Sequence, residues 1–276
     1  MSARCILGMV VALSLGWSAS AGAALVAHES FEGYTADTAV DGGNLGTGWT
    51  TPWSGQPPAT VVEQALSYSG GDITIDGGNQ ALQITGADTD DNMVNRSFAP
   101  QSDTFYFSFL FQSPTAGADT DRDFIQIWVH DGPFATSMAA AIHDQVSGDD
   151  FRFWARIAAG SGGSEAPPPS TVVGDTYFVV GKVSKTDGSD TFNRVDVFVN
   201  PTTLSEPATS TTSHTGDTNR EQMSVLGIRT ALLEQEDLYF LDEFHIGSTW
   251  AAVIPEPSSL LIVGLLGGGL LLRRRV

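Results

Sequence analysis

Four phenylalanines at every second position of one short segment restrict the fold of this chain more than any other feature. Residues 104–111 have the sequence TFYFSFLF, with phenylalanine rings at positions 105, 107, 109 and 111. Side chains alternate between the two faces of a β-strand, so these rings share one face and Tyr106, Ser108 and Leu110 share the other. Four aromatic rings on one face need a second layer to cover them. The segment therefore predicts a strand in a layered β protein.

Similar segments recur along the chain between clusters of Gly, Asp, Ser and Pro. In one of them Ile125, Ile127 and Val129 share a face. We expect strands at residues 25–31, 80–85, 93–98, 104–111, 124–129, 138–143, 151–157, 177–183, 192–199, 224–229 and 238–247. No amphipathic helix of useful length stands out among them. This pattern predicts an all-β fold, an antiparallel β-sandwich.

Two segments between the expected strands are predicted to be loops. Residues 160–170 combine Gly162 and Gly163 with three consecutive prolines, which predicts a flexible stretch followed by a stiff one. Residues 201–218 are rich in Thr and Ser, which predicts a long exposed loop. Neither segment has the change of charge that marks a domain boundary. We therefore expect one β-sandwich domain at residues 25–250.

The first 24 residues have the pattern of a secretory signal peptide. Arg4 and the amino terminus precede an uncharged apolar stretch, and small residues follow at Ala21, Ala23 and Ala24. This pattern predicts cleavage after Ala23 or Ala24. The chain has one cysteine, Cys5, which lies before the apolar stretch. Its position argues against a lipoprotein, and the exported part is expected to hold no disulfide.

The last 26 residues, 251–276, combine three parts. Residues 254–259 carry two prolines, residues 260–272 contain only Leu, Ile, Val and Gly, and residues 273–275 are arginines. A 13-residue helix reaches about 20 Å against a hydrocarbon core of about 30 Å, so this segment is marginal as a permanent span. The arginines would stay on the cytoplasmic side of a membrane. The alternative is a buried terminal core helix, against which the adjacent arginines and the internal glycines argue.

This tail resembles the PEP-CTERM sorting signal of Gram-negative bacteria. The resemblance is carried by the motif Pro255, Glu256 and Pro257, by the short apolar helix, and by the cluster Arg273, Arg274 and Arg275. It implies processing near the motif by exosortase, an integral membrane protein thought to be a cysteine transpeptidase. It also implies transient membrane anchoring through the C-terminal helix, export to the outer envelope or the extracellular matrix, and an association with exopolysaccharide or biofilm.

The chain is strongly acidic, with 32 Asp and Glu residues against 13 Lys and Arg and a net charge of −19. Four of the basic residues belong to the two ends, so the part between them is more acidic still. A surface of this kind repels nucleic acid and anionic membranes and attracts cations. We therefore exclude a nucleic-acid partner, and a divalent cation such as Ca²⁺ remains an option.

The two ends of the expected domain carry a second resemblance. Residues 28–34, with Trp49 and Trp53 after them, are similar to the opening of lectin-like domains often carried by PEP-CTERM proteins, and residues 241–250 are similar to their closing strand. The resemblance implies a concanavalin A-like (laminin G-like) jelly roll in which the first and last strands pair. That fold is shared by lectins, glycosidases, lyases and structural modules, so it leaves the function open.

Two acidic segments are candidate Ca²⁺ ligands because this cation takes six to eight hard oxygen ligands. They consist of Asp88, Asp90 and Asp91 in the first segment and of Asp119, Asp121 and Asp123 in the second. Neither segment has the spacing of an EF-hand loop, and solvated turn acids are the plainer interpretation. Asp242 and Glu243 are expected to cap or close the last strand.

No catalytic constellation follows from the sequence, and we expect a protein that is not an enzyme. Glu234, Glu236 and Asp237 lack the spacing of the carboxylates in laminarinase-like jelly-roll glycosidases, and we predict a polar turn there. The five histidines have no spacing that suggests a zinc site or a nucleophile–base pair. Trp49 and Trp53, in a Gly- and Pro-rich segment, are expected to be the most exposed tryptophans and are candidates for stacking on sugar rings.

The sequence thus favours a non-enzymatic exported protein with transient contacts to signal peptidase and exosortase and an association with extracellular polysaccharide. Two alternatives stay open. The first is a lectin-like carbohydrate-binding module that depends on Ca²⁺. The second is a polysaccharide hydrolase or lyase on the same fold.

Overall fold

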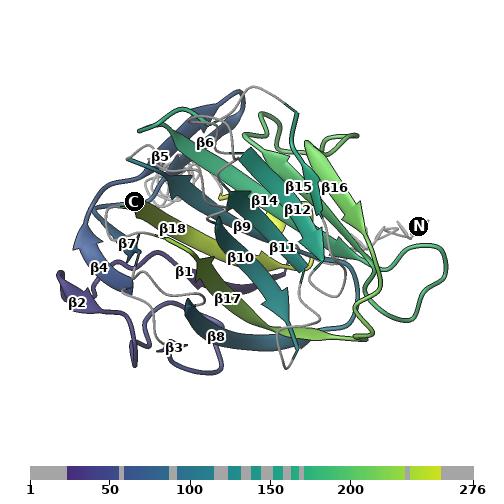
Figure 1. Ribbon diagram of the computed structural model, residues 1–276, viewed down its shortest axis with the longest axis horizontal. Helices are drawn as coiled ribbons and strands as arrows, with labels where there is room; N and C mark the ends of the chain where they lie inside the picture. The colour runs from purple at the N-terminus through teal and green to yellow at the C-terminus, as the bar shows by residue number, and fades with distance from the viewer. Residues whose placement is uncertain are drawn as a thin grey trace, which may run out of the picture.

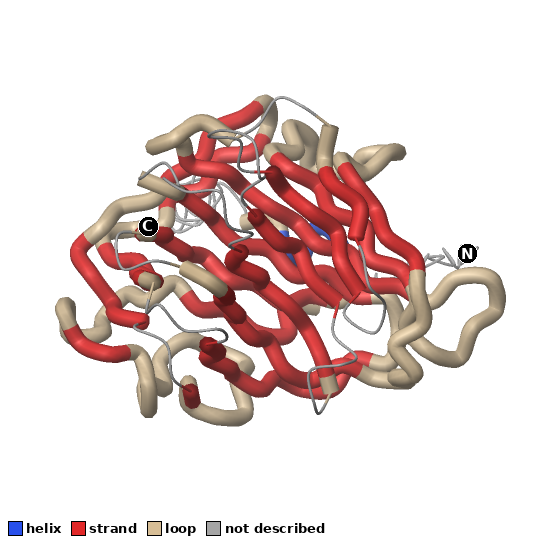
Figure 2. The backbone as a smooth tube through the Cα atoms, in the orientation of Figure 1, coloured by secondary structure: helices blue, strands red, loops and turns tan. Residues whose placement is uncertain are grey.

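A computed structural model describes residues 24–55, 59–86, 92–114, 124–131, 138–143, 152–157, 163–167, 171–233 and 237–255. Most of this part is β-strand, and one short helix, α1 (Trp250–Val253), accompanies the strands (Figure 2). The expected N-terminal signal helix and the C-terminal apolar helix lie outside the described residues. Within the described ranges, no helix has the length and the hydropathy needed to cross a membrane.

The larger sheet contains nine strands (Figure 1). Eight of them lie in the order β16-β15-β14-β9-β18-β7-β4-β2, and β1 pairs with β18 beside this path. Their bounds are β1 (Leu25–Glu29), β2 (Thr38–Ala39), β4 (Ala59–Glu63), β7 (Gln80–Thr85), β9 (Phe105–Gln112), β14 (Thr176–Ser184), β15 (Arg194–Val199), β16 (Thr212–Thr215) and β18 (Leu238–Gly247). All the pairings are antiparallel, as predicted.

The second sheet contains seven strands in the order β13-β12-β11-β10-β17-β8-β3, also antiparallel. Their bounds are β3 (Ser54–Gly55), β8 (Asn92–Gln101), β10 (Phe124–His130), β11 (Met138–His143), β12 (Arg152–Ile157), β13 (Gly163–Glu165) and β17 (Met223–Ala231). A separate hairpin consists of β5 (Ser67–Gly70) and β6 (Ile73–Asp76). The fold is therefore an antiparallel β-sandwich, which confirms the predicted class.

The main core lies between the two sheets. Phe105, Phe107, Phe109 and Phe111 of β9 are fully buried in it, together with Ile125, Ile127 and Val129 of β10. The alternation of the phenylalanines therefore predicted both the strand and the layer that covers it. Their burial helps to hold the sheets together, since each buried aromatic side chain contributes about 1.5–3 kcal/mol.

A second apolar cluster covers the other face of β9. Tyr106 and Leu110 pack there with Phe178 of β14, Tyr68 of the β5–β6 hairpin and Trp250 of α1. Val253 and Ile254 belong to the same cluster and are almost fully buried. The packed part of the chain therefore continues past residue 250, the boundary predicted from the sequence, to Ile254.

The first and last strands pair as predicted, with His28 of β1 opposite His245 of β18. In Figure 1 the purple β1 lies beside the yellow-green β18, although the two strands come from opposite ends of the domain. β7 pairs with residues 238–241 of β18, and β1 pairs with residues 244–247. The register between β18 and β9 shifts between Asp242 and His245, which marks a β-bulge at the point where β7 gives way to β1.

Several short strands were not predicted from the sequence. The segment 201–218 is not a continuous loop, because it contains β16, which pairs with β15. Residues 160–170 likewise contain β13 at the edge of the seven-stranded sheet. The other strands that were missed are β2, β3, β4, β5 and β6. Strands of two to five residues carry too few side chains for a visible alternation.

Candidate functional site

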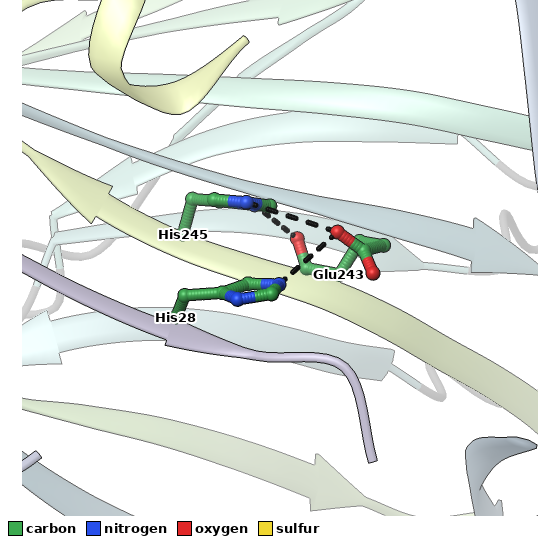
Figure 3. A group of neighbouring side chains, drawn as sticks. All are labelled: His28, Glu243 and His245. Carbon is green, nitrogen blue, oxygen red and sulfur yellow. Dashed lines mark hydrogen bonds and ion pairs between the residues drawn. The ribbon is translucent and has the colours of Figure 1, made fainter. Parts of the chain in front are cut away.

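Two histidines and a glutamate from the two ends of the domain meet on the nine-stranded sheet. His28 comes from β1, and Glu243 and His245 come from β18 (Figure 3). Glu243 Oε2 lies 3.2 Å from His28 Nε2 and 3.7 Å from His245 Nε2. The two imidazole rings are stacked, with centroids 4.3 Å apart and an interplanar angle of 21°. We call these three residues the His–Glu cluster.

The β-bulge of β18 brings Glu243 into this cluster. Glu243 has a φ of 51°, in the left-handed region that side chains other than glycine rarely adopt. Its amide N–H donates to the Asp242 Oδ1 carboxyl oxygen at 2.7 Å, which supports the turn of the backbone. The extra residue lets Asp242, Glu243 and His245 lie close together within a single strand. The prediction that Asp242 and Glu243 close the end of the strand is wrong, because they lie buried in its middle.

The hydrogen bonds of His245 determine which ring nitrogen carries the proton. Its Nδ1 lies 3.0 Å from the backbone carbonyl oxygen of Glu243, which can only accept, so Nδ1 is the donor. Burial, followed by the adjacent His28, lowers the pKa of His245 to about 4. At neutral pH His245 is therefore uncharged, and its Nε2 presents a lone pair toward the Glu243 carboxylate.

Asp242 is the most deeply buried acid of this region. Burial, followed by the carboxylates of Glu243, Glu32 and Glu29, raises its pKa to about 10. Its Oδ2 atom has no hydrogen-bond partner among the described residues. Gly77 lies directly against this atom, so that a side chain at position 77 would collide with it. The Asp242 carboxyl is thus uncharged at neutral pH, in closely packed surroundings.

The cluster does not form a nucleophile–base pair with the nearby serine. Ser108 of β9 is the strand partner of His245. Its side chain is fully buried and donates to the Val253 backbone carbonyl at 2.8 Å. The Ser108 hydroxyl therefore holds the segment after α1 on the sheet, and acyl-transfer chemistry does not fit its environment. Two imidazoles and a carboxylate are instead the usual ligands of a transition metal.

A second buried polar group lies on the inner side of β1. The Glu29 carboxylate forms an ion pair with Arg96 of β8 and accepts a hydrogen bond from the Tyr34 hydroxyl at 2.9 Å. Trp49 and Trp53 lie against the Arg96 guanidinium, at 5.0 and 5.7 Å from their ring centroids. This arrangement joins the two sheets at one end of the sandwich.

The prediction that Trp53 is exposed is wrong, since 1% of its surface is accessible. Its ring packs against Phe31 and Phe244 in the main core. Trp49 is half-buried, and its indole N–H donates to the backbone carbonyl of His28 at 2.9 Å. Both tryptophans therefore serve the packing around Arg96, and Trp53 is closed to a sugar ring from solvent.

A polar groove of about 520 Å³ lies over β14, β15 and the segment before β16. Arg194 and Asp196 form a bidentate pair there at 2.9 and 2.7 Å, and Lys182 pairs with Glu206 at 2.7 Å. Hydroxyl groups complete the wall. The lining residues are Lys182, Arg194, Asp196, Phe198 and Glu206, followed by residues 207–213.

Most of the other predicted site residues lie outside the described part of the chain. These are Asp88, Asp90, Asp91, Asp119, Asp121 and Asp123 of the calcium hypothesis, Ala21 and Ala23 of the cleavage site, and Glu256, Pro257, Arg273, Arg274 and Arg275 of the tail. Ala24 is exposed just before β1, and Pro255 is half-buried and directly follows the buried Ile254. Glu234 and Glu236 also lie outside, whereas Asp237 is buried.

The His–Glu cluster was missed because its residues are more than 200 positions apart in sequence. The predicted pairing of the first and last strands could have indicated the cluster, since it places residues 25–31 beside residues 238–247. Only the register of β1 on β18 could have shown that the two histidines meet, and the position of the Glu243 side chain depends on the bulge. The glycine-free sequence around Glu243 gives no sign of that bulge.

No family model matches the sequence, and no curated protein matches it. Among solved structures, an alginate lyase mutant in complex with alginate tetrasaccharide has a TM-score of 0.48 at 13% identity, over 80% of this chain and 96% of that chain. The T. cruzi calreticulin globular domain has a TM-score of 0.44 at 9% identity, over 87% and 91%. A lectin from Bauhinia forficata in complex with GalNAc has a TM-score of 0.37 at 14% identity, over 70% and 93%. Likenesses at this level carry no inference about function.

Proposed function

We propose that this chain is an exported, non-enzymatic β-sandwich protein that its C-terminal signal sorts to the envelope or the extracellular matrix, where it associates with polysaccharide. The observation that carries the proposal is the sequence of the tail together with its position. Val253 and Ile254 are buried on the nine-stranded sheet, and the Pro-Glu-Pro motif begins at the next residue, Pro255. The motif thus follows directly on the part of the chain that packs into the domain.

The experiment that tests sorting is the mass of the mature protein in a host that makes an exosortase. We expect the wild-type chain, recovered from the envelope, to lack the residues after the motif. Glu256→Ala and replacement of the three terminal arginines by glutamine should leave the tail attached, and Glu221→Ala, on a surface turn, serves as the control. An identical C-terminus in a host with and without the exosortase contradicts the proposal.

A second candidate function is direct binding of carbohydrate in the polar groove. The bidentate Arg194–Asp196 pair, the Lys182–Glu206 pair and the neighbouring hydroxyls supply planar donors and acceptors that suit a polyhydroxyl ligand. Arg194 is 38% exposed and Lys182 is 26% exposed, so both are accessible from solvent. This observation favours polysaccharide over an apolar ligand.

Binding of soluble polysaccharides, measured on a glycan array, tests this candidate. We expect Arg194→Ala and Lys182→Ala to weaken binding at least about tenfold each, which corresponds to a loss of about 1.4 kcal/mol. Lys185→Ala is the matched control, because Lys185 lies over Phe192 and outside the groove. Loss of binding on addition of a chelator, restored by Ca²⁺ and not by Zn²⁺, would point instead to the Ca²⁺-dependent alternative at the aspartate segments.

A further inference from the structure

We infer that His28, Glu243 and His245 form a binding site for a late first-row divalent metal ion, with Zn²⁺ as the cation that fits the ligands best. The inference is independent of the proposed function. It starts from the ligand types, because two imidazole nitrogens and one carboxylate oxygen form the ligand set of many zinc sites with an open fourth position. Nitrogen donors of this kind disfavour Ca²⁺ and Mg²⁺, which prefer oxygen.

The distances agree with a shared ion. Ligand bonds of about 2.0–2.1 Å in a tetrahedral zinc site place neighbouring ligand atoms about 3.3–3.4 Å apart. Glu243 Oε2 lies 3.2 Å from His28 Nε2 and 3.7 Å from His245 Nε2, close to that separation on both sides. All three ligand atoms lie within 4.8 Å of one another. The His28 side chain is 30% exposed and can turn to bring its nitrogen nearer to that of His245.

One hydrogen bond of the cluster orients His245 for binding a metal ion. Its Nδ1–H donates to the Glu243 carbonyl at 3.0 Å, which fixes the ring and directs the Nε2 lone pair toward the Glu243 carboxylate. The Nε2 lone pair of His245 then faces the Glu243 carboxylate oxygen at 3.7 Å. Both side chains are largely buried, with His245 8% and Glu243 10% exposed. A cation between them turns this unfavourable contact into two ligand bonds.

The surroundings also favour a cation. Asp242 directly precedes Glu243 and is fully buried. One of its side-chain oxygens has no hydrogen-bond partner in the described part of the chain. The exposed edge of His28 provides the entry path and the position for a fourth ligand from solvent. A bound ion would tie the first strand of the domain to the last.

Metal binding by the full-length protein tests the inference. After treatment with a chelator and its removal, we expect one equivalent of Zn²⁺ per chain by equilibrium dialysis with elemental analysis. Co²⁺ should give the visible absorption of a four-coordinate site with nitrogen and oxygen ligands, and Zn²⁺ should remove it. Ca²⁺ in millimolar excess should leave the Co²⁺ spectrum unchanged, which separates this site from the aspartate segments.

Variants identify the ligands. His28→Ala and Glu243→Gln should each weaken Zn²⁺ binding at least about 100-fold. Removing a residue that only supports a metal ligand already costs about 10–100-fold, and the loss of a direct ligand should cost more. His214→Ala is the matched control, because that histidine lies on β16 beside Ser164. Zn²⁺ should also raise the melting temperature of the wild type and leave that of His28→Ala unchanged.

Two outcomes overturn the inference. One is a wild-type chain that takes up no stoichiometric Zn²⁺, and the other is equal affinity in the wild type and in His28→Ala. His28 is partly exposed, so this variant is expected to fold, and its circular dichroism spectrum verifies that. If Glu243→Gln does not fold, the wild-type stoichiometry, the Co²⁺ spectrum and His28→Ala still decide the question.

Discussion

Glu29 of the nine-stranded sheet and Arg96 of the seven-stranded sheet form an ion pair in which each side chain is 1% exposed. Arg96 also donates to the backbone carbonyls of Thr51 and Leu45, at 3.0 and 2.7 Å. Each nitrogen of the guanidinium thus has a partner that lies far from Arg96 in sequence. The pair is therefore the polar counterpart of the aromatic core, because it fixes how the two sheets and the segment 44–53 meet.

Replacing Arg96 by methionine should destabilise the protein by about 3–5 kcal/mol. The substitution keeps most of the side-chain volume but leaves the Glu29 charge buried without its partner. Urea unfolding followed by tryptophan fluorescence measures the change. Lys182→Met is the control, since the Lys182–Glu206 pair is 26% and 30% exposed and should contribute about 0–1 kcal/mol.

The double variant Glu29→Leu with Arg96→Met gives the sharper test. If the buried charge causes the loss, removing both charges should restore a large part of the stability that Arg96→Met alone removes. Additive losses would show instead that packing around Trp49 and Trp53 is what Arg96 contributes.

The strands of the core could be predicted from the sequence, because their side chains alternate over six or more residues. β7, β11 and β18 have the predicted bounds. β16 could not be predicted: its polar sequence Thr-Ser-His-Thr forms a strand because β15 offers it an edge, and because Thr212 donates to the Ser164 carbonyl at 2.7 Å. Such edge contacts come from tertiary structure and leave no local pattern.

The candidate site was less predictable than the fold. The predicted pairing of β1 with β18 was correct, yet the meeting of His28 and His245 depends on the register of that pairing. The position of Glu243 depends in addition on a bulge of one residue in the pairing of β18 with β9. A change of register by one residue would direct these side chains to the opposite face. Glu243 has a positive φ although it is not a glycine, so the sequence gives no indication of this backbone conformation.

Gly181→Ala should destabilise the protein by about 1–3 kcal/mol through overpacking. Gly181 of β14 lies opposite Phe107 of β9, and a methyl group there would come within 2.2 Å of the Phe107 ring. Gly216→Ala is the matched control, because its methyl group would meet Ile157 at an ordinary 3.7 Å. Thermal unfolding measures both variants, and equal melting temperatures would contradict the steric argument.

Trp250→Ala should cost about 3–5 kcal/mol, the usual loss for a buried tryptophan. The ring is 5% exposed and packs edge-on against Phe198 and Tyr106, with centroids 5.0 and 6.2 Å away. Trp250→Phe should retain most of the stability, because the indole N–H has no hydrogen-bond partner among the described residues. A chemical unfolding curve for each variant tests whether α1 belongs to the domain. A small loss in Trp250→Ala would show that α1 adds little to the stability of the domain.

Tyr34 should make the stability fall as the pH rises from 10 to 12. Burial, followed by the nearby Glu29 carboxylate, raises the pKa of Tyr34 from 10 to about 12. Between these values the unfolded chain loses the phenol proton and the folded chain keeps it, so unfolding becomes more favourable with rising pH. Below pH 10 this contribution to stability is fully present.

Tyr34→Phe separates this effect from the other tyrosines. The variant loses the hydrogen bond to Glu29 and the one from the Leu45 amide, so it should be less stable than the wild type at pH 8 by about 1–3 kcal/mol. The difference in unfolding free energy should shrink as the pH rises from 10 to 12, because only the wild type still carries the raised pKa. Urea unfolding at pH 8, 10, 11 and 12 measures that difference. A difference that stays constant over this range would show that Tyr34 ionises alike in the folded and unfolded chains, and that its hydroxyl is not held between Glu29 and Leu45.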